Sequence, residues 1–169
     1  MSGFRICRVD LAGGGRIGIC HLPGLHSPLE EDVSQIIAWR PAIVLTLLEL
    51  SESDCLAQDH LSALLRPSSI DWQHFPVQDF GVLEGASLAM WPGLSGRLHA
   101  ILNARRGVLV HCRGGLGRSG MIALRLMVER GEDPESAFER LRKARPGAVE
   151  TDAQLGWSTR GKMRSLGGA

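Results

Sequence analysis

The chain has 169 residues, of which 44% are hydrophobic and 22% charged, and its formal net charge is +1. This length and composition predict a single globular domain over 1–169 with enough apolar residues for a sizeable core. The near-neutral charge gives no basis for binding nucleic acid or membranes through bulk electrostatics, and no segment approaches the roughly 18 apolar residues of a membrane span.

Short strands and amphipathic segments alternate through the first half of the chain. Residues 4–9 and 16–20 predict two strands, which the glycine turn at 12–15 joins into an N-terminal hairpin within 1–22. Ser27 to Glu30 have the pattern of a capping box, at the start of a helix that stops before Arg40. The remaining predicted elements of this half are a central strand over 42–48, a helix over 53–65 and a strand over 72–75.

The second half predicts more helix than strand. Its elements are a helix over 93–105, the innermost strand over 108–111, a buried helix over 121–130, a helix over 135–145 capped by Asp133, and a last helix from Thr151. The tail over 157–169 contains basic residues and no acid, which predicts a weakly cationic or frayed end. This alternation predicts an α/β fold with a central, mostly parallel sheet flanked by helices.

The stretch from Val108 to Gly120 places a thiol between a buried strand and the start of a helix. Such a junction gathers backbone N–H groups and the positive end of a helix dipole around one point, which suits phosphate. The same surroundings favour the thiolate form of Cys112. Arg118 adds a planar guanidinium that can hold two phosphate oxygens, so the sequence predicts a nucleophile inside an anion site.

Other interpretations of this junction are weaker. Gly115, Gly117 and Gly120 satisfy the G-x-G-x-x-G dinucleotide fingerprint, but that fold requires a second parallel strand where residues 134–145 predict a helix. A Walker A loop requires lysine at the position of Arg118. Cys112 as a plain core residue is the remaining structural alternative.

The pattern His111-Cys112-x-x-Gly115-x-x-Arg118-Ser119 resembles the Cys-x5-Arg-Ser signature of the cysteine-dependent protein tyrosine phosphatase superfamily. Together with residues 17–24, it is similar to the dual-specificity branch related to the cyclin-dependent kinase-associated phosphatase. The resemblance covers roughly 16–154. It implies a phosphotyrosine phosphatase-like fold of dual-specificity type and hydrolysis through a phosphocysteine, with neither a cofactor nor a metal.

The resemblance also implies roles for individual residues. Cys112 attacks phosphorus in line, and the substrate's equatorial oxygens are bound by Arg113, Gly114, Gly115, Leu116, Gly117 and Arg118. Asp79 matches an x-x-Pro-x-x-Asp pattern, so it protonates the leaving group and then activates water. Glu84, on the same loop, is the fallback acid.

Three further residues support this chemistry. Ser119 donates a hydrogen bond to the thiolate, or caps the following helix, or does both. The resemblance implies that His111 holds the loop in shape and that Gln154 orients the hydrolytic water. His21 and His26 are five residues apart with Pro23-Gly24 between them, which does not suggest a metal site.

The expected function is a protein phosphatase acting on phosphotyrosine and on phosphoserine and phosphothreonine. Its expected partners are a phosphorylated protein or a small phosphomonoester, with phosphate, sulfate or vanadate able to occupy the loop. A lipid or sugar phosphatase, a phosphoprotein-binding pseudophosphatase and a thiolate redox enzyme such as an arsenate reductase stay open as alternatives.

The thiol content and the N-terminal sequence predict a cytoplasmic location with reduced cysteines. A disulfide between Cys112 and Cys7, Cys20 or Cys55 stays undecided, as do the oligomeric state and the role of the basic tail.

Overall fold

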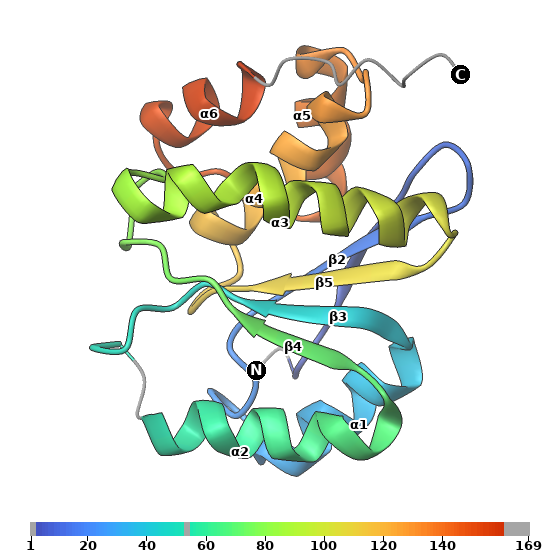
Figure 1. Ribbon diagram of the computed structural model, residues 1–169, viewed down its shortest axis with the longest axis vertical. Coiled ribbons are helices and arrows are strands. Elements are labelled where there is room, and N and C mark those ends of the chain that lie inside the picture. Colours follow the sequence, from blue (N-terminus) through green and yellow to red (C-terminus); the bar gives the residue numbers. More distant parts are fainter. Residues whose placement is uncertain (1–2, 53–54, 161–169) are drawn as a thin grey trace.

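The computed structural model describes residues 3–52 and 55–160, with the side chains of residues 55 and 56 left out. Its centre is a five-stranded sheet in the order β1-β2-β5-β3-β4 (Figure 1). β1 is antiparallel to β2, and the other three neighbouring pairs are parallel. The strands are β1 (Cys7–Asp10), β2 (Arg16–Cys20), β3 (Pro41–Thr46), β4 (Asp71–His74) and β5 (Gly107–His111). The predicted mostly parallel sheet with β5 at its middle is therefore confirmed.

Helices cover both faces of the sheet (Figure 1). One face carries α1 (Leu29–Trp39) and α2 (Cys55–Leu65), which the short 3₁₀ helix η1 (Arg66–Ser68) follows. The other face carries α3 (Gly85–Asn103), α4 (Gly117–Glu129), α5 (Pro134–Ala144) and α6 (Asp152–Thr159). Within the described part of the chain, no helix combines the length and apolar character needed to cross a bilayer.

The core consists of two apolar clusters that the sheet separates. Along β5, Val108 and Val110 belong to the cluster under α3 and α4, whereas Leu109 belongs to the cluster over α1 and α2. This is the alternation of a strand with two buried faces. β5 is thus fixed from both sides, and the residues that follow it are held on a rigid support.

Two helices begin earlier than the sequence pattern predicts. α4 begins at Gly117 rather than at 121, after Leu116 as N-cap, so Arg118 and Ser119 lie in its first turn. Ser119 is therefore not the N-cap. α3 begins at Gly85 rather than at 93 and contains Pro92. A proline removes one helical hydrogen bond, but burial of the apolar face of α3 maintains the helix through it.

Smaller differences concern helix ends. Pro28, not Ser27, is the N-cap of α1, and the Ser27 hydroxyl donates to Asp32 at 2.5 Å instead of capping the helix. Thr151 caps α6 as predicted, and the helix runs to Thr159, so residues 157–159 of the predicted tail are helical. The rest of that tail, 161–169, and residues 53–54 of the predicted second helix lie outside the described residues.

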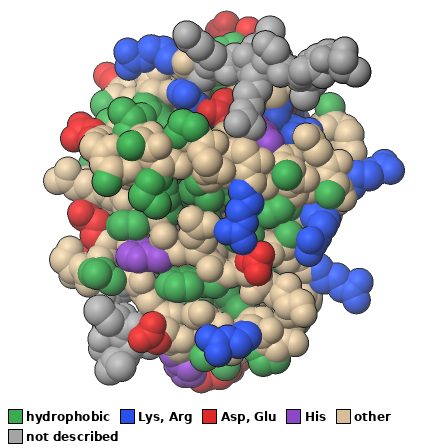
Figure 2. All heavy atoms as spheres, viewed as in Figure 1, with side chains coloured by type: hydrophobic (Ala, Val, Ile, Leu, Met, Phe, Trp, Pro, Cys, Tyr) green, Lys and Arg blue, Asp and Glu red, His purple; other side chains and the backbone are tan. Residues whose placement is uncertain are grey.

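The face of the molecule drawn in Figure 2 carries side chains of both charge signs with apolar side chains exposed among them. The large apolar side chains that are most exposed in the described residues are Leu50, Phe80, Leu88 and Met90. Two of them, Leu50 and Phe80, lie close in sequence to the acidic residues that contact Arg118, as described next.

Candidate active site

Cys112 directly follows β5 at the carboxyl end of the sheet, and Ser119 lies in the first turn of α4. The Cys112 Sγ and the Ser119 Oγ are 3.2 Å apart, and both side chains are buried. The structure therefore brings the two residues together as predicted. We call residues 112–118 the Cys112 loop.

The carbonyl groups of the Cys112 loop are held from outside. The Leu22 amide donates to the Arg113 carbonyl at 2.9 Å, and Arg145 donates to the carbonyls of Gly114 at 2.8 Å and Gly115 at 2.9 Å. In a trans peptide the C=O and the next N–H point in opposite directions. The N–H groups of the following residues consequently turn toward the inside of the loop, which is the arrangement that binds an oxyanion.

Two glycines allow the loop to pack this closely. Gly115 has a φ of +67°, and a Cβ at that position would collide with the Cys20 carbonyl group. A Cβ on Gly117 would collide with the Glu150 carboxylate. Gly114 and Arg113 are exposed, and Leu116 is half-buried, its carbonyl accepting from Gly120 and Val149.

Arg118 is 2% exposed, and four of its five N–H groups have partners. Nη1 donates to Glu52 at 2.6 Å and to the Val77 carbonyl at 3.0 Å. Nη2 donates to the second Glu52 oxygen at 2.8 Å and lies 3.1 Å from an Asp79 oxygen. The fifth group, the buried Nε, has no partner in the described residues.

The ion pair between Glu52 and Arg118 maintains both charges. Burial acts to raise the pKa of Glu52, but the hydrogen bonds from Arg118 outweigh it and the pKa lies below its ordinary value of 4.5. Burial likewise acts to lower the pKa of Arg118, and its bonds to Glu52 raise it. Arg118 is therefore a permanent cation beside Cys112.

Glu52 is a site residue that sequence reasoning missed. It lies on the segment after β3, 66 positions from Arg118 in the chain. A general rule could have pointed to it, because a buried guanidinium is almost always paired with a carboxylate. Glu52 follows the strand next to β5, so it lies at the same edge of the sheet as Cys112.

Asp79 is in the loop between β4 and α3 and comes within reach of Arg118, as its predicted role requires. Its side chain is 47% exposed and also accepts from the Phe80 amide. The preceding residues are tied to β3 through Phe75 and Val77, whose amides donate to the carbonyls of Thr46 and Leu47. Glu84, the fallback acid, is the exposed N-cap of α3.

Gln154 is fully buried at the start of α6 and connects that helix to the Asp79 loop. Its amide nitrogen donates to the Gly81 carbonyl at 3.2 Å, and its oxygen accepts from the amides of Glu150 and Thr151. A Cβ on Gly117 would lie 3.1 Å from this oxygen, so Gln154 is next to the Cys112 loop.

His111 belongs to a chain of hydrogen bonds that crosses three strands. Burial lowers the pKa of His111 to about 4, so the ring is neutral at pH 7. Its Nδ1 then donates to the Cys112 carbonyl at 3.3 Å, and its Nε2 accepts from the Thr46 hydroxyl at 2.7 Å. Trp72 donates to the same hydroxyl, at 2.9 Å. The ring thus ties the start of the Cys112 loop to β3 and β4.

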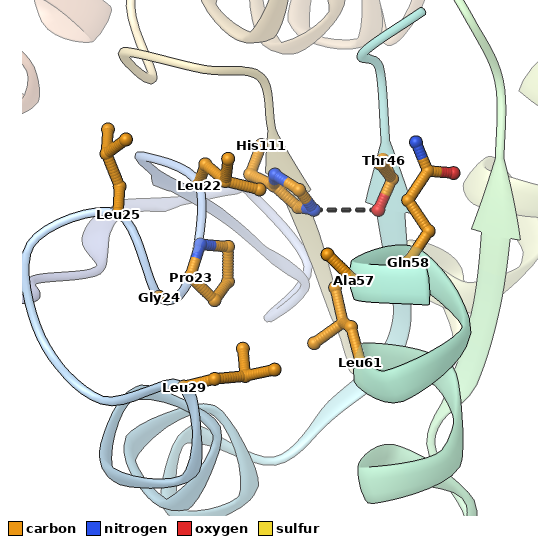
Figure 3. A pocket seen from close by; sticks show the side chains of 10 residues that line it. All are labelled: Leu22, Pro23, Gly24, Leu25, Leu29, Thr46, Ala57, Gln58, Leu61 and His111. Atoms are coloured by element: carbon orange, nitrogen blue, oxygen red, sulfur yellow. Dashed lines mark hydrogen bonds between the residues drawn. The ribbon is translucent and has the colours of Figure 1, made fainter. Parts of the chain in front are cut away.

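A cavity of about 270 Å³ lies against this chain on the α1–α2 side of the sheet (Figure 3). The segment after β2 and the helix α2 form its walls, with His111 and Thr46 at its inner end (Figure 3). Its lining residues are Leu22, Pro23, Gly24, Leu25, Leu29, Thr46, Ala57, Gln58, Leu61 and His111.

Cys20 is near the site but on the other face of the sheet. It pairs in register with His111 and belongs to the α1–α2 cluster, whereas Cys112 belongs to the cluster under α4. Burial, and secondarily the charge of Cys112, raise the pKa of Cys20 well above its ordinary value. Among the cysteines with described side chains, Cys7, Cys20 and Cys112 are free thiols.

Comparisons with known proteins agree with this geometry. The family model for protein-tyrosine phosphatase matches residues 95–163, which include the whole Cys112 loop. Human cyclin-dependent kinase inhibitor 3 is 27% identical over 149 residues, which cover 83% of this chain and 69% of the human protein. The mouse protein of the same name is 28% identical over 148 residues, with the same coverage.

Residues 95–163 thus match the protein-tyrosine phosphatase family, and the chain as a whole is similar to the cysteine-dependent protein tyrosine phosphatase superfamily. It is an enzyme of the protein phosphatase type and resembles the kinase-associated phosphatase within the dual-specificity branch.

Solved structures of kinase-associated phosphatase, Tk-PTP and PTPMT1 share the fold of this chain. A kinase-associated phosphatase with serine in place of its catalytic-site cysteine superposes with a TM-score of 0.79, at 24% identity and 93% coverage of both chains. The active form of Tk-PTP gives a TM-score of 0.67 at 24% identity, covering 91% of this chain and 97% of that one. PTPMT1 in complex with PI(5)P gives 0.65 at 19% identity, covering 85% and 87%.

Proposed function

We propose that this phosphatase hydrolyses phosphomonoesters on phosphorylated proteins through a covalent intermediate on Cys112. The observation that carries the proposal is the buried Nε of Arg118, which has no acceptor in the described residues although it shares a loop with the Cys112 sulfur. A buried donor of this kind needs an acceptor. An oxygen of the substrate's phosphate provides one while phosphorus lies in front of the sulfur.

In the first step, the Cys112 thiolate attacks phosphorus and the bond to the leaving oxygen breaks. Asp79 gives its proton to that oxygen, which leaves as an alcohol or phenol. Asp79 must give up its contact with Arg118 for this step, so that Nη2 becomes available to the phosphate together with Nε. The N–H groups of residues 113–118 bind the other oxygens.

In the second step, the Asp79 carboxylate takes a proton from water, the water oxygen attacks phosphorus and the S–P bond breaks. The departing thiolate is stabilised by the Ser119 hydroxyl, which lies 3.2 Å from the sulfur. Gln154 orients this water in our proposal. In support, one of its amide N–H groups is left over after the bond to Gly81, and the side chain lies beside Gly117.

The proposed substrates are phosphotyrosine, phosphoserine and phosphothreonine in proteins. Exposed apolar side chains at Leu50 and Phe80, on the segments that hold Glu52 and Asp79, offer contacts for a peptide beside the phosphate. Phosphate, sulfate and vanadate should compete for the Cys112 loop. Free thiols at Cys7, Cys20 and Cys112 support a reducing, cytoplasmic location.

The test is turnover of p-nitrophenyl phosphate in the presence of a chelator. We expect activity in the native protein and none in Cys112→Ser. A fold-preserving Cys112→Ser or Asp79→Ala variant, used as a trap in a cell lysate, should then retain phosphoproteins. Retention of small or lipid phosphates alone would contradict a protein substrate. Absence of turnover with intact phosphopeptide binding would indicate a pseudophosphatase, and a fast thiol-coupled reduction of arsenate would indicate a redox enzyme.

A further inference from the structure

The cavity of about 270 Å³ on the α1–α2 side of the sheet has mostly apolar walls (Figure 3). Leucines from the segment after β2, from α1 and from α2 contribute most of the lining, and no charged side chain is among its described lining residues. An apolar cavity of roughly 150 Å³ can stay dry and bind benzene. The larger cavity of this protein therefore has room for a neutral bicyclic aromatic molecule.

The outer part of the cavity is accessible from solvent. Leu22, Leu25 and Leu29 are half-buried and Ala57 is exposed, whereas Thr46 and His111 at the inner end are fully buried. A small molecule can thus enter between the segment after β2 and α2, without passing through the Cys112 loop.

The inner end of the cavity offers one hydrogen-bond acceptor. A hydroxyl group has one proton to donate and two lone pairs. The Thr46 proton goes to the His111 Nε2 at 2.7 Å, and Trp72 donates to one lone pair at 2.9 Å. The second lone pair has no donor among the described residues. Because burial lowers the pKa of His111 to about 4, its ring is neutral at pH 7 and gives no charge for an ionic ligand to pair with.

Two residues of the cavity wall also hold the Cys112 loop. The His111 Nδ1 donates to the Cys112 carbonyl at 3.3 Å, and the Leu22 amide donates to the Arg113 carbonyl at 2.9 Å. These bonds keep the carbonyl groups outward and the following N–H groups inward. A molecule that packs against His111 and Leu22 therefore favours the loop arrangement that binds an oxyanion. Two ligands that favour one arrangement strengthen each other's binding.

We propose that this cavity is an effector site for a small neutral aromatic molecule with one N–H or O–H group, and that its occupancy strengthens anion binding in the Cys112 loop. The aromatic rings contact the leucines and the His111 ring, and the N–H or O–H group donates to the Thr46 oxygen. Neither Cys112 nor Arg118 lines the cavity, so the effector acts without entering the catalytic loop. The coupling rests on the proposed function, because the anion is the product of the proposed reaction.

Indole is the probe, because it is bicyclic and has a single N–H donor. We would measure its Kd by NMR titration, with and without saturating inorganic phosphate. Phosphate should lower the Kd of indole about fivefold, at the lower end of allosteric couplings. 1-Benzofuran has nearly the same shape and no N–H group, so it should bind about fivefold more weakly than indole, the loss expected for one hydrogen bond.

Two variants reduce the cavity from different walls. Ala57→Leu adds volume from α2 and Leu29→Trp adds it from α1, and each should abolish indole binding while circular dichroism shows a native fold. Ala63→Leu is the matched control, because Ala63 is an exposed residue of the same helix that does not line the cavity. It should bind indole as the native protein does.

Absence of indole binding, or binding that survives in a folded variant with a reduced cavity, would overturn the inference. Equal affinity for indole and 1-benzofuran would exclude Thr46 as the acceptor, and an indole Kd that phosphate leaves unchanged would exclude the coupling, so either result also overturns it. Phosphate affinity is measured separately without indole. A protein that binds indole but not phosphate would contradict the proposed function, which distinguishes that failure from a failure of the cavity to bind its ligand.

Discussion

At the scale of single residues, the chemistry depends on how Arg118 is held. A guanidinium that is 2% exposed would be very costly alone, and Glu52 offsets that cost with two hydrogen bonds in a fork geometry. The same bonds leave Nε without a partner in the described residues, so Glu52 sets both the charge and the orientation of the Arg118 guanidinium.

The Glu52→Gln substitution should therefore lower both the activity and the stability of the protein. We expect kcat/KM for p-nitrophenyl phosphate to fall roughly 10–100-fold, because Arg118 loses its charged partner. The free energy of unfolding should fall by about 2–3 kcal/mol, below the cost for a fully buried pair because the Glu52 side chain is 17% exposed. Steady-state kinetics and urea unfolding measure the two effects. Glu139→Gln, on the exposed face of α5, should change neither.

In the proposed mechanism Asp79 competes with the substrate for Arg118, which predicts opposite effects of its removal on anion binding and on turnover. In Asp79→Ala, kcat should fall by about 10²–10⁴, the usual contribution of a general acid. Sulfate should bind several-fold more tightly, because Nη2 loses the carboxylate that lies 3.1 Å away. Sulfate inhibition and sulfate-dependent melting curves measure the affinity. Weaker sulfate binding in this variant would mean that Asp79 instead orders Arg118 for the anion.

The site residues that lie within one local motif were predictable from the sequence. Glu52, which only the fold brings to the site, was not. Cys112, Arg118 and Ser119 lie within eight positions of one another, so their spacing alone implies a common site. Asp79 follows a recognisable pattern after a strand. Glu52 has no such pattern: Glu49 to Ser53 resemble any polar connection, and its pairing depends on β3 lying next to β5.

At the scale of elements, the passage from β5 into α4 depends on backbone packing against β2. Gly115→Ala requires a left-handed φ of +67° and places a methyl group against the Cys20 carbonyl. We expect a loss of about 3 kcal/mol in unfolding free energy and a loss of more than about 100-fold in kcat/KM, because the loop amides move. Chemical unfolding and turnover of p-nitrophenyl phosphate measure the two losses.

Gly114→Ala is the control at the adjacent position. A Cβ there meets nothing within 4 Å, and Gly114 does not have a positive φ. Its unfolding free energy should change by less than about 0.5 kcal/mol. If Gly114→Ala and Gly115→Ala lost the same unfolding free energy, close packing against β2 would not be what determines the conformation of the Cys112 loop.

The types of the elements were predictable because the apolar residues of each strand and helix recur at the spacing typical of that element. Several boundaries, in contrast, depend on tertiary contacts. The sequence predicts a helix that starts only at Gly93, after Pro92, yet α3 begins at Gly85 and continues through both residues because Trp91, Leu94 and Leu98 are buried. The glycines at 115 and 117 likewise suggested a long loop. Packing of Gly120 against Val149 instead brings α4 close to the segment before α6, and the helix starts at Gly117.

At the scale of the whole molecule, one buried carboxylate joins the three helices that surround the site. Glu129 on α4 accepts from Trp91, Ser95 and His99 of α3 at 2.9, 2.5 and 2.9 Å. It also accepts from Arg125 at 2.8 Å, which in turn donates to the Trp157 carbonyl of α6. The helix α4, which carries Arg118 in its first turn, is thus fixed at its far end by α3 and α6.

This carboxylate should make stability depend on pH in the acid range. Burial acts to raise the pKa of Glu129, but the bonds from His99, Ser95, Arg125 and Trp91 outweigh it and lower the pKa to about 2, from an ordinary 4.5. The ionised group therefore stabilises the fold by about 3 kcal/mol above pH 4.5, and that contribution is lost as the pH falls toward 2. About 2 kcal/mol of it should already be lost at pH 3.

Glu129→Gln removes this titration while nearly preserving the side chain's shape. At pH 7 the variant should be less stable than the native protein by about 3 kcal/mol, and the difference should shrink to about 1 kcal/mol at pH 3. Urea unfolding at pH 3, 5 and 7 measures it, and Glu139→Gln should follow the native curve throughout. Other carboxylates, Glu52 among them, titrate alike in all three proteins, so their contributions to the pH dependence of the unfolding free energy cancel in the comparison. A constant difference across this range would mean that Glu129 contributes through its shape and not through its charge.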